Sequence, residues 1–220
     1  METVYIVGAL VLGAVILYFL FGTQTDTSGA IVLVAGSQNG DMEKSTSLEL
    51  PRSFNQPQGL TFTYSAWVLI KDFTAGYGNR RRIFSKGDCP GLYIDSTSNS
   101  FVVSMDTYGA KETILIPNIP AMKWIHIAIV VDQNSVDIYI NGILRQHHSL
   151  AQLPKQNEEP VLQGPGWDGV LARLKYYPRA LNHVEIKEQS QEPVPDDLQG
   201  KISGPQYFDM SWYIGRLYSK

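Results

Sequence analysis

The sequence has little cysteine and no site for N-glycosylation. Cys89 is the single cysteine among 220 residues, so no disulfide can form within the chain. No asparagine is followed by x-Ser or x-Thr, where x is not proline. Because an oxidising compartment favours disulfides, the two absences together favour a globular part that faces a reducing, unglycosylated space.

A strongly basic face is also missing. The net charge is −3 and the pI is near 5.8, which argues against nucleic acid as the main partner, since phosphate binding needs a basic surface. The one basic cluster is Arg80–Arg82 with Lys86. We interpret it as a solvated strand edge that discourages sheet-to-sheet pairing. The alternative is a contact with an acidic partner surface or with anionic lipid.

Motifs for chemistry are lacking as well. The sequence has no GxSxG elbow, no glycine-rich phosphate loop and no His/Cys ligand spacing. Cys89 precedes a proline in an expected turn and is interpreted as an incidental free thiol. His147 and His148 are adjacent at a strand end and do not easily face one metal, and His126 is expected to be a buried, hydrogen-bonded core residue. We therefore predict no catalytic residue and no bound cofactor.

What the chain does have first is a long apolar run at its N-terminus. Residues 4–21 contain no charge, and as a helix they span about 27 Å, close to the roughly 30 Å hydrocarbon core of a bilayer. A cleaved signal peptide is the alternative, but the preceding residues carry no Lys or Arg, and the run exceeds the usual apolar length of such peptides. We predict a single-pass membrane anchor over residues 1–22, followed by a flexible stalk over residues 23–30.

Several residues have expected roles inside this anchor. Val4 begins the span, and Tyr5, Tyr18 and Phe21 are placed at the two interfaces, where aromatic side chains are favoured. Gly13 lies four residues after a small alanine, a spacing that allows helices to approach closely. The first basic residue after the span is distant, so the orientation in the membrane stays open.

From residue 31 onward the pattern is that of β-structure. Residues 60–70 alternate between apolar and polar positions, and residues 124–132 are apolar on both faces, as in a central strand covered on both sides. Asn141-Gly142 between two alternating runs predicts a hairpin. Asn182 and Glu185 have the spacing of a helix capping box. Strands recur every 8–12 residues, as in all-β sandwiches.

Three segments carry a family resemblance: YSAWVLI (64–70), VDIYINGIL (136–144) and DGVLARLKYYPRALNHVEI (168–186). In this order they resemble the laminin-G-like, concanavalin A-like jelly roll. The resemblance implies an all-β fold, a two-sheet antiparallel sandwich over residues 31–186 with a short capped helix near 182–188. It also implies binding more often than chemistry. Relatives that cut β-glucans carry a Glu-x-Asp-x-Glu strand, which this chain lacks, so we predict a non-enzymatic protein.

The same resemblance suggests where ligands would bind. Many laminin-G-like domains bind calcium at one rim, and the candidate ligands here are the carboxylates of Asp88, Asp95, Asp106 and Asp168. No dense acidic loop supplies the six to eight oxygens that calcium takes. For a glycan, Tyr108 and Trp167 are the candidate stacking residues, both in expected loops.

The C-terminal region, residues 187–220, changes in character. It begins as a polar, proline-containing tail and ends in a group of aromatic residues: Tyr207, Phe208, Trp212, Tyr213 and Tyr218. Aromatic anchors of this kind suit docking to a partner protein. The alternative is that the tail folds back and covers its own sandwich.

Two functions are consistent with these observations. The segments YSAWVLI, RRIFSKGD, VDIYINGIL and LKYYPRAL are similar to those of laminin-G-like proteins in nucleocytoplasmic large DNA viruses. That similarity implies a minor capsid or virion membrane protein that links the internal membrane to the capsid shell, with the bilayer and capsid proteins as partners. The alternative is a membrane-displayed lectin that binds glycans. A lectin should bring an exposed aromatic and an adjacent Asp or Asn into one groove.

Overall fold

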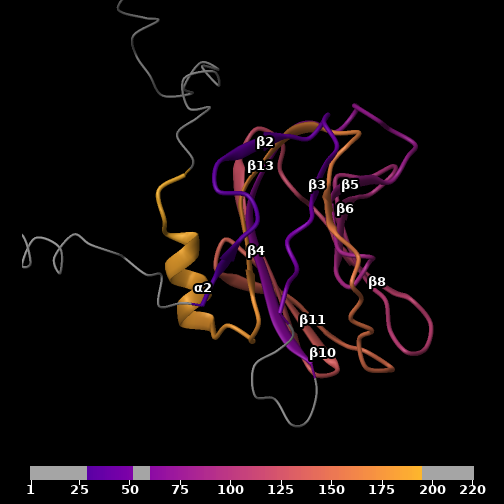
Figure 1. Cartoon of the computed structure of the whole chain (residues 1–220). Coiled ribbons are helices and arrows are strands. Elements are labelled where there is room, and N and C mark those ends of the chain that lie inside the picture. Colours follow the sequence, from indigo (N-terminus) through magenta and orange to yellow (C-terminus); the bar gives the residue numbers. More distant parts are fainter. Residues whose placement is uncertain (1–28, 52–59, 195–220) are drawn as a thin grey trace, which may run out of the picture. The chain divides into compact units, whose positions relative to one another are not determined.

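The computed structural model describes residues 29–51 and 60–194 (Figure 1). The predicted membrane span and the aromatic residues 207–218 lie outside these ranges, so both stay predictions. Within the described ranges, no helix combines the length and the apolar character needed to cross a bilayer.

The described residues form two antiparallel sheets that pack face to face (Figure 1). The first sheet contains β1 (Ile31–Val32), β13 (Asp168–Tyr177), β4 (Thr61–Asp72), β9 (Trp124–Asp132), β10 (Ser135–Ile140) and β11 (Ile143–Ser149) in this order, and β2 (Ser37–Asn39) also pairs with β13. The second contains β3 (Lys44–Thr46), β12 (Val161–Gln163), β5 (Arg81–Ser85), β6 (Gly91–Ile94), β7 (Phe101–Met105) and β8 (Glu112–Ile116). The predicted all-β, two-sheet antiparallel sandwich is therefore confirmed.

The core lies between the two sheets and follows the alternation in the sequence. In β4 the alternate residues Phe62, Tyr64 and Val68 point inward, because successive side chains of a strand face opposite sides. In β9 the inward residues are isoleucines and a valine, while His126 and Ala128 on the other face are also buried. The prediction that this strand is covered on both faces is confirmed.

The helix α2 (His183–Ser190) covers part of the outer face of the first sheet, beside β4 (Figure 1). Its predicted capping box is present: the Asn182 side chain accepts from the backbone N–H groups of Val184 and Glu185, and the Glu185 carboxylate accepts from the Asn182 N–H. The helix continues to Ser190, so the first four residues of the predicted tail are helical. The sandwich thus includes a helical layer on one side.

The predicted NG hairpin joins β10 to β11. Asn141 and Gly142 have φ values of 50° and 78°, the left-handed conformation at both central positions that a two-residue hairpin turn requires. The turn lies against α2, since a Cβ on Gly142 would be 2.4 Å from the Ser190 hydroxyl oxygen. This contact leaves no room for a side chain at position 142.

Two members of the basic cluster are buried, which corrects its interpretation as a solvated edge. The Arg81 guanidinium donates to the carbonyl oxygens of Phe73 (2.5 Å) and Ala75 (2.8 Å), and the Lys86 ammonium to those of Asn157 (2.6 Å) and Glu159 (2.9 Å). Each cation therefore holds a loop in place. The sequence could not show this, because the partners are backbone oxygens.

Candidate functional site

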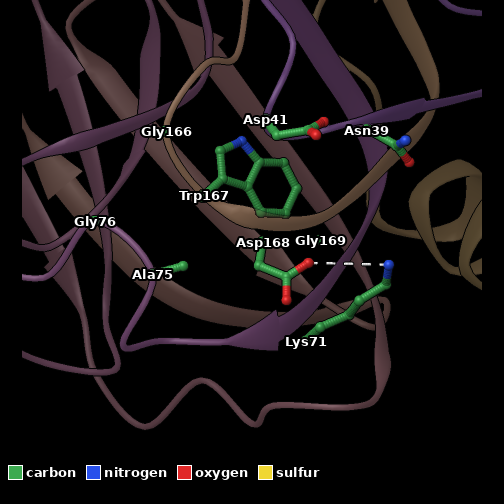
Figure 2. Close-up of a pocket in the computed structure, with 9 residues that line it drawn as sticks. All are labelled: Asn39, Asp41, Lys71, Ala75, Gly76, Gly166, Trp167, Asp168 and Gly169. Carbon is green, nitrogen blue, oxygen red and sulfur yellow. Dashed lines mark ion pairs between the residues drawn. The ribbon is translucent and has the colours of Figure 1, made fainter.

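A cavity of about 500 Å³ opens at the end of the sandwich where β2 and β4 end and β13 begins (Figure 2). We call it the rim pocket. Its lining comes from four short segments: Asn39, Asp41, Lys71, Ala75, Gly76, Gly166, Trp167, Asp168 and Gly169. Carboxylates, an amide and an ammonium thus meet at one concave place.

Trp167 forms the wall of the rim pocket and is only 2% exposed. A Cβ on Gly40 or on Gly169 would lie 2.3 Å from indole carbons, so only glycine backbones fit at these two places. The ring faces are therefore not free to stack on a sugar, and the prediction of Trp167 as a glycan-stacking residue is wrong. Its Nε1–H is buried with no hydrogen-bond partner among the described residues.

Two carboxylates lie on either side of this indole in Figure 2. Asp168 is 3.9 Å from the Lys71 ammonium, and the two side chains are 51% and 37% exposed, so this ion pair is loose and solvated. The Asp41 carboxylate is exposed and has no hydrogen-bond donor or cation among the described residues. Asp41 is therefore the acceptor most available to a ligand.

The loop between β4 and β5, which supplies Ala75 and Gly76 to the pocket lining, also carries an exposed aromatic residue. Tyr77, next to the lining residue Gly76, is 63% exposed. Arg81 holds this loop from beneath, and burial lowers the pKa of its guanidinium. At the start of the loop, the Thr74 hydroxyl and N–H donate to Asp72, which lowers the pKa of that carboxyl. Tyr77 is thus presented on a fixed loop.

Tyr108 lies at the other end of the sandwich. It is 73% exposed and lines a shallow hollow of about 190 Å³ with Leu60, just before β4 begins. Trp167 lies where β4 ends, and this strand of 12 residues is about 40 Å long. The two predicted stacking residues therefore do not form one site.

The calcium candidates are divided between the two ends. Asp88 and Asp106 are neighbours at the end that holds Tyr108, where the Asp106 N–H donates to the Asp88 carbonyl at 2.7 Å, while Asp168 lies in the rim pocket. Burial of the Asp88 carboxyl acts to raise its pKa, but hydrogen bonds from Lys111 and Tyr93 keep that pKa below its usual range. The described residues contain no group of three metal-binding side chains. Calcium binding stays a prediction.

The remaining carboxylate candidate, Asp95, is used within its own turn. Its side chain accepts from the N–H and the hydroxyl of Ser98 at 3.0 and 2.8 Å, and these bonds lower its pKa. An aspartate that completes a local turn in this way has a structural reason to be there.

The histidines and the cysteine have structural surroundings. His126 is buried as predicted, and its Nε2 lies 2.9 Å from the Ser65 hydroxyl, but its Nδ1 has no partner among the described residues. Burial, and then the charge of Lys175, lower its pKa to about 4. His147 and His148 bond to different carboxylates. Cys89 is buried, which raises its pKa to about 12 and leaves it a poor nucleophile.

Sequence reasoning missed Asn39, Asp41, Lys71 and Tyr77. Residues 37–46 are rich in turn-forming residue types, and Lys71 simply follows the alternating residues 60–70. The available signal was weak: Asn39-Gly40-Asp41 places two polar side chains around a glycine. Only the packing of Gly40 on Trp167 shows that this turn borders the pocket.

Comparison with known proteins agrees with this architecture. A family model described as the concanavalin A-like lectin/glucanases superfamily matches residues 39–187. No curated protein sequence matches the chain. The binding domain of Paraclostridial mosquitocidal protein 1 superposes with a TM-score of 0.55 at 20% identity, over 74% of this chain and 45% of that one. The receptor binding domain of botulinum neurotoxin D gives 0.56 at 14% identity, over 76% and 48%. This chain thus matches about half of either domain, and the likeness is one of fold.

Proposed function

The chain belongs to the concanavalin A-like lectin/glucanases superfamily, and on that premise we propose that it is a non-enzymatic recognition protein that binds a glycan in the rim pocket. The observation that carries the proposal is the meeting of Asn39, Asp41 and Asp168 in one hollow, with the exposed Tyr77 next in sequence to the lining residue Gly76. Sugar hydroxyls bind to carboxylate and amide groups, and sugar rings pack on aromatic side chains.

Binding fits these residues better than glycan cleavage. A glycosidase needs a carboxylic acid kept protonated by an apolar enclosure and a second carboxylate across the scissile bond. Asp168 instead is half exposed and lies beside an ammonium. The sequence also lacks the paired-carboxylate strand of the glucan-cutting relatives.

The test is glycan binding by the full chain, first on an array and then by calorimetry. Asp41→Asn and Asp168→Asn should each weaken binding about tenfold, the usual effect of losing a hydrogen bond to a charged group. The matched control is Asp132→Asn, at the opposite end of the sandwich. Unchanged affinity in both pocket variants would place any glycan elsewhere, and failure of the full chain to bind any glycan would overturn the proposal.

We further propose that this recognition domain is held at a membrane by residues 4–21, as a single-pass protein. The support is the uncharged run of 18 residues. Alkaline extraction of membranes from cells expressing the full chain tests it: the protein should stay with the bilayer, and its release would overturn the anchor. The control is a chain that lacks residues 1–22.

A capsid-linking role in a virion is a second proposal and rests on the resemblance of the sequence segments. It is favoured by the density of aromatic residues between 207 and 218, which suits contacts with other proteins. Under this proposal the sandwich and tail contact capsid proteins, and the protein links the membrane to the capsid shell. Under the glycan proposal the rim pocket stays accessible. If neighbouring proteins in the assembled particle cover the rim pocket, the capsid-linking role is favoured.

A further inference from the structure

The rim pocket carries an excess of negative charge, and this bears on which glycan it accepts. Of its lining residues, Asp41 and Asp168 are acidic and Lys71 is basic. Building on the proposed function, we infer that the pocket selects neutral or amino sugars over sugars that carry a carboxylate or a sulfate.

The Asp41 carboxylate determines which ligand groups can bind next to it. An ionised carboxylate accepts hydrogen bonds and donates none. A sugar hydroxyl or ammonium brings the donor that Asp41 lacks among the described residues, whereas a carboxylate or sulfate brings acceptors and a like charge. An acidic group placed there leaves two anions facing each other without a proton between them.

The nearby cations do not reverse this preference. The Lys71 ammonium is 3.9 Å from Asp168 and is balanced by it, so one negative charge remains at Asp41. Arg81 lies under the neighbouring loop, but it is buried and its guanidinium donates to the carbonyl oxygens of Phe73, Ala75 and Asp95. Arg81 is therefore not free to receive an acidic sugar, and an acidic group that approached Lys71 would also meet the Asp168 carboxylate.

The experiment compares a neutral oligosaccharide ending in lactose with its sialylated counterpart, using the full chain. At low salt the neutral sugar should bind at least about threefold more tightly, as expected for one unbalanced charge several ångströms away in water. The ratio should approach one in about 1 M salt, because screening acts over roughly 3 Å there. Equal or tighter binding of the sialylated sugar at low salt overturns the inference but leaves the proposed function standing. Binding of neither sugar, nor of any other on the array, overturns both.

Two variants test the assigned charges. Asp41→Asn should bring the neutral-to-sialylated ratio close to one, and Lys71→Gln should increase it, because the second change leaves Asp168 unbalanced. Asp132→Asn, at the other end of the sandwich, should leave the ratio unchanged. An unchanged ratio in both pocket variants, with circular dichroism like that of the parent chain, overturns the inference.

Discussion

The two ends of the sandwich use similar residues differently. At the end that holds Tyr108, the opposite rim, Lys86 is buried and donates to two carbonyl oxygens, while Asp88 accepts hydrogen bonds from Lys111 and Tyr93. In the rim pocket, Lys71 and Asp168 form one loose, solvated pair, and Asp41 has no partner within residues 29–51 and 60–194. Polar groups that already have protein partners hold a loop in place, and those that do not are available to a ligand.

The largest effect is expected from a methyl group added at the rim pocket. In Gly169→Ala the Cβ would be 2.2 Å from the Leu69 carbonyl oxygen and 2.3 Å from Trp167, so backbone must move. We expect a loss of about 3 kcal/mol in the free energy of unfolding, measured by urea denaturation. Gly109→Ala at the opposite rim is the control, because its Cβ meets side chains and no backbone: Gln152 at 2.9 Å and the Thr107 hydroxyl at 3.6 Å. Equal losses would contradict the packing argument.

The second prediction extends the comparison to the outer face of the first sheet, where His126 is buried. Its pKa is about 4 in the folded state against an ordinary value of 6.5, so the unfolded chain binds the proton more tightly. Stability is therefore full above pH 6.5 and falls as the pH is lowered from 6.5 to 4, by up to about 3 kcal/mol.

The measurement is the free energy of unfolding as a function of pH. His126→Gln should flatten the profile between pH 6.5 and 4, whatever its effect on absolute stability. A steep profile retained in His126→Gln would show that another group titrates.

The third prediction compares the two lysines directly. Lys86→Met leaves the carbonyl oxygens of Asn157 and Glu159 without their donor and should cost about 2 kcal/mol of stability. Lys71→Met removes an exposed pair and should cost less than about 0.5 kcal/mol. The free energies of unfolding of the two variants are measured by urea denaturation. A loss for Lys71→Met as large as the loss for Lys86→Met would overturn the distinction between the two ends.

The smallest effect on stability is expected from deleting residues 195–220. The described sandwich ends before this segment, after Glu192 pairs with Lys175 at 3.4 Å. We expect an unfolding free energy within about 0.5 kcal/mol of the parent. If the aromatic residues dock to a partner, the shortened chain should also leave the complexes that the full chain forms in membrane extracts. Unchanged incorporation would contradict the docking role, and a large loss of stability would favour packing on its own domain.

The sequence predicted most of the fold and little of the site. Strand alternation in residues 60–70, the Asn141-Gly142 turn and the Asn182–Glu185 capping box are local features, so a short window of sequence contains their cause. The rim pocket depends on residues separated by more than a hundred positions, such as Asp41 and Trp167. Nothing in either window indicates that they meet.

Two errors have the same origin. Trp167 looked like an exposed aromatic in a loop, and Arg81 like a solvated cation on a strand edge. Both are buried, because Gly40 and Gly169 make room for the indole and backbone carbonyls surround the guanidinium. Backbone atoms are common to all residues, so their availability as partners cannot be read from residue types.

By itself, the sequence determined the fold class, the hairpin, the helix cap and the family, because periodicity and turn chemistry act between near neighbours in the chain. The tertiary structure alone decided which polar groups are satisfied and which face a ligand. That outcome depends on distances between segments far apart in the sequence. Burial also changes the energy of a charge or a hydrogen bond far more than the type of residue that carries it does.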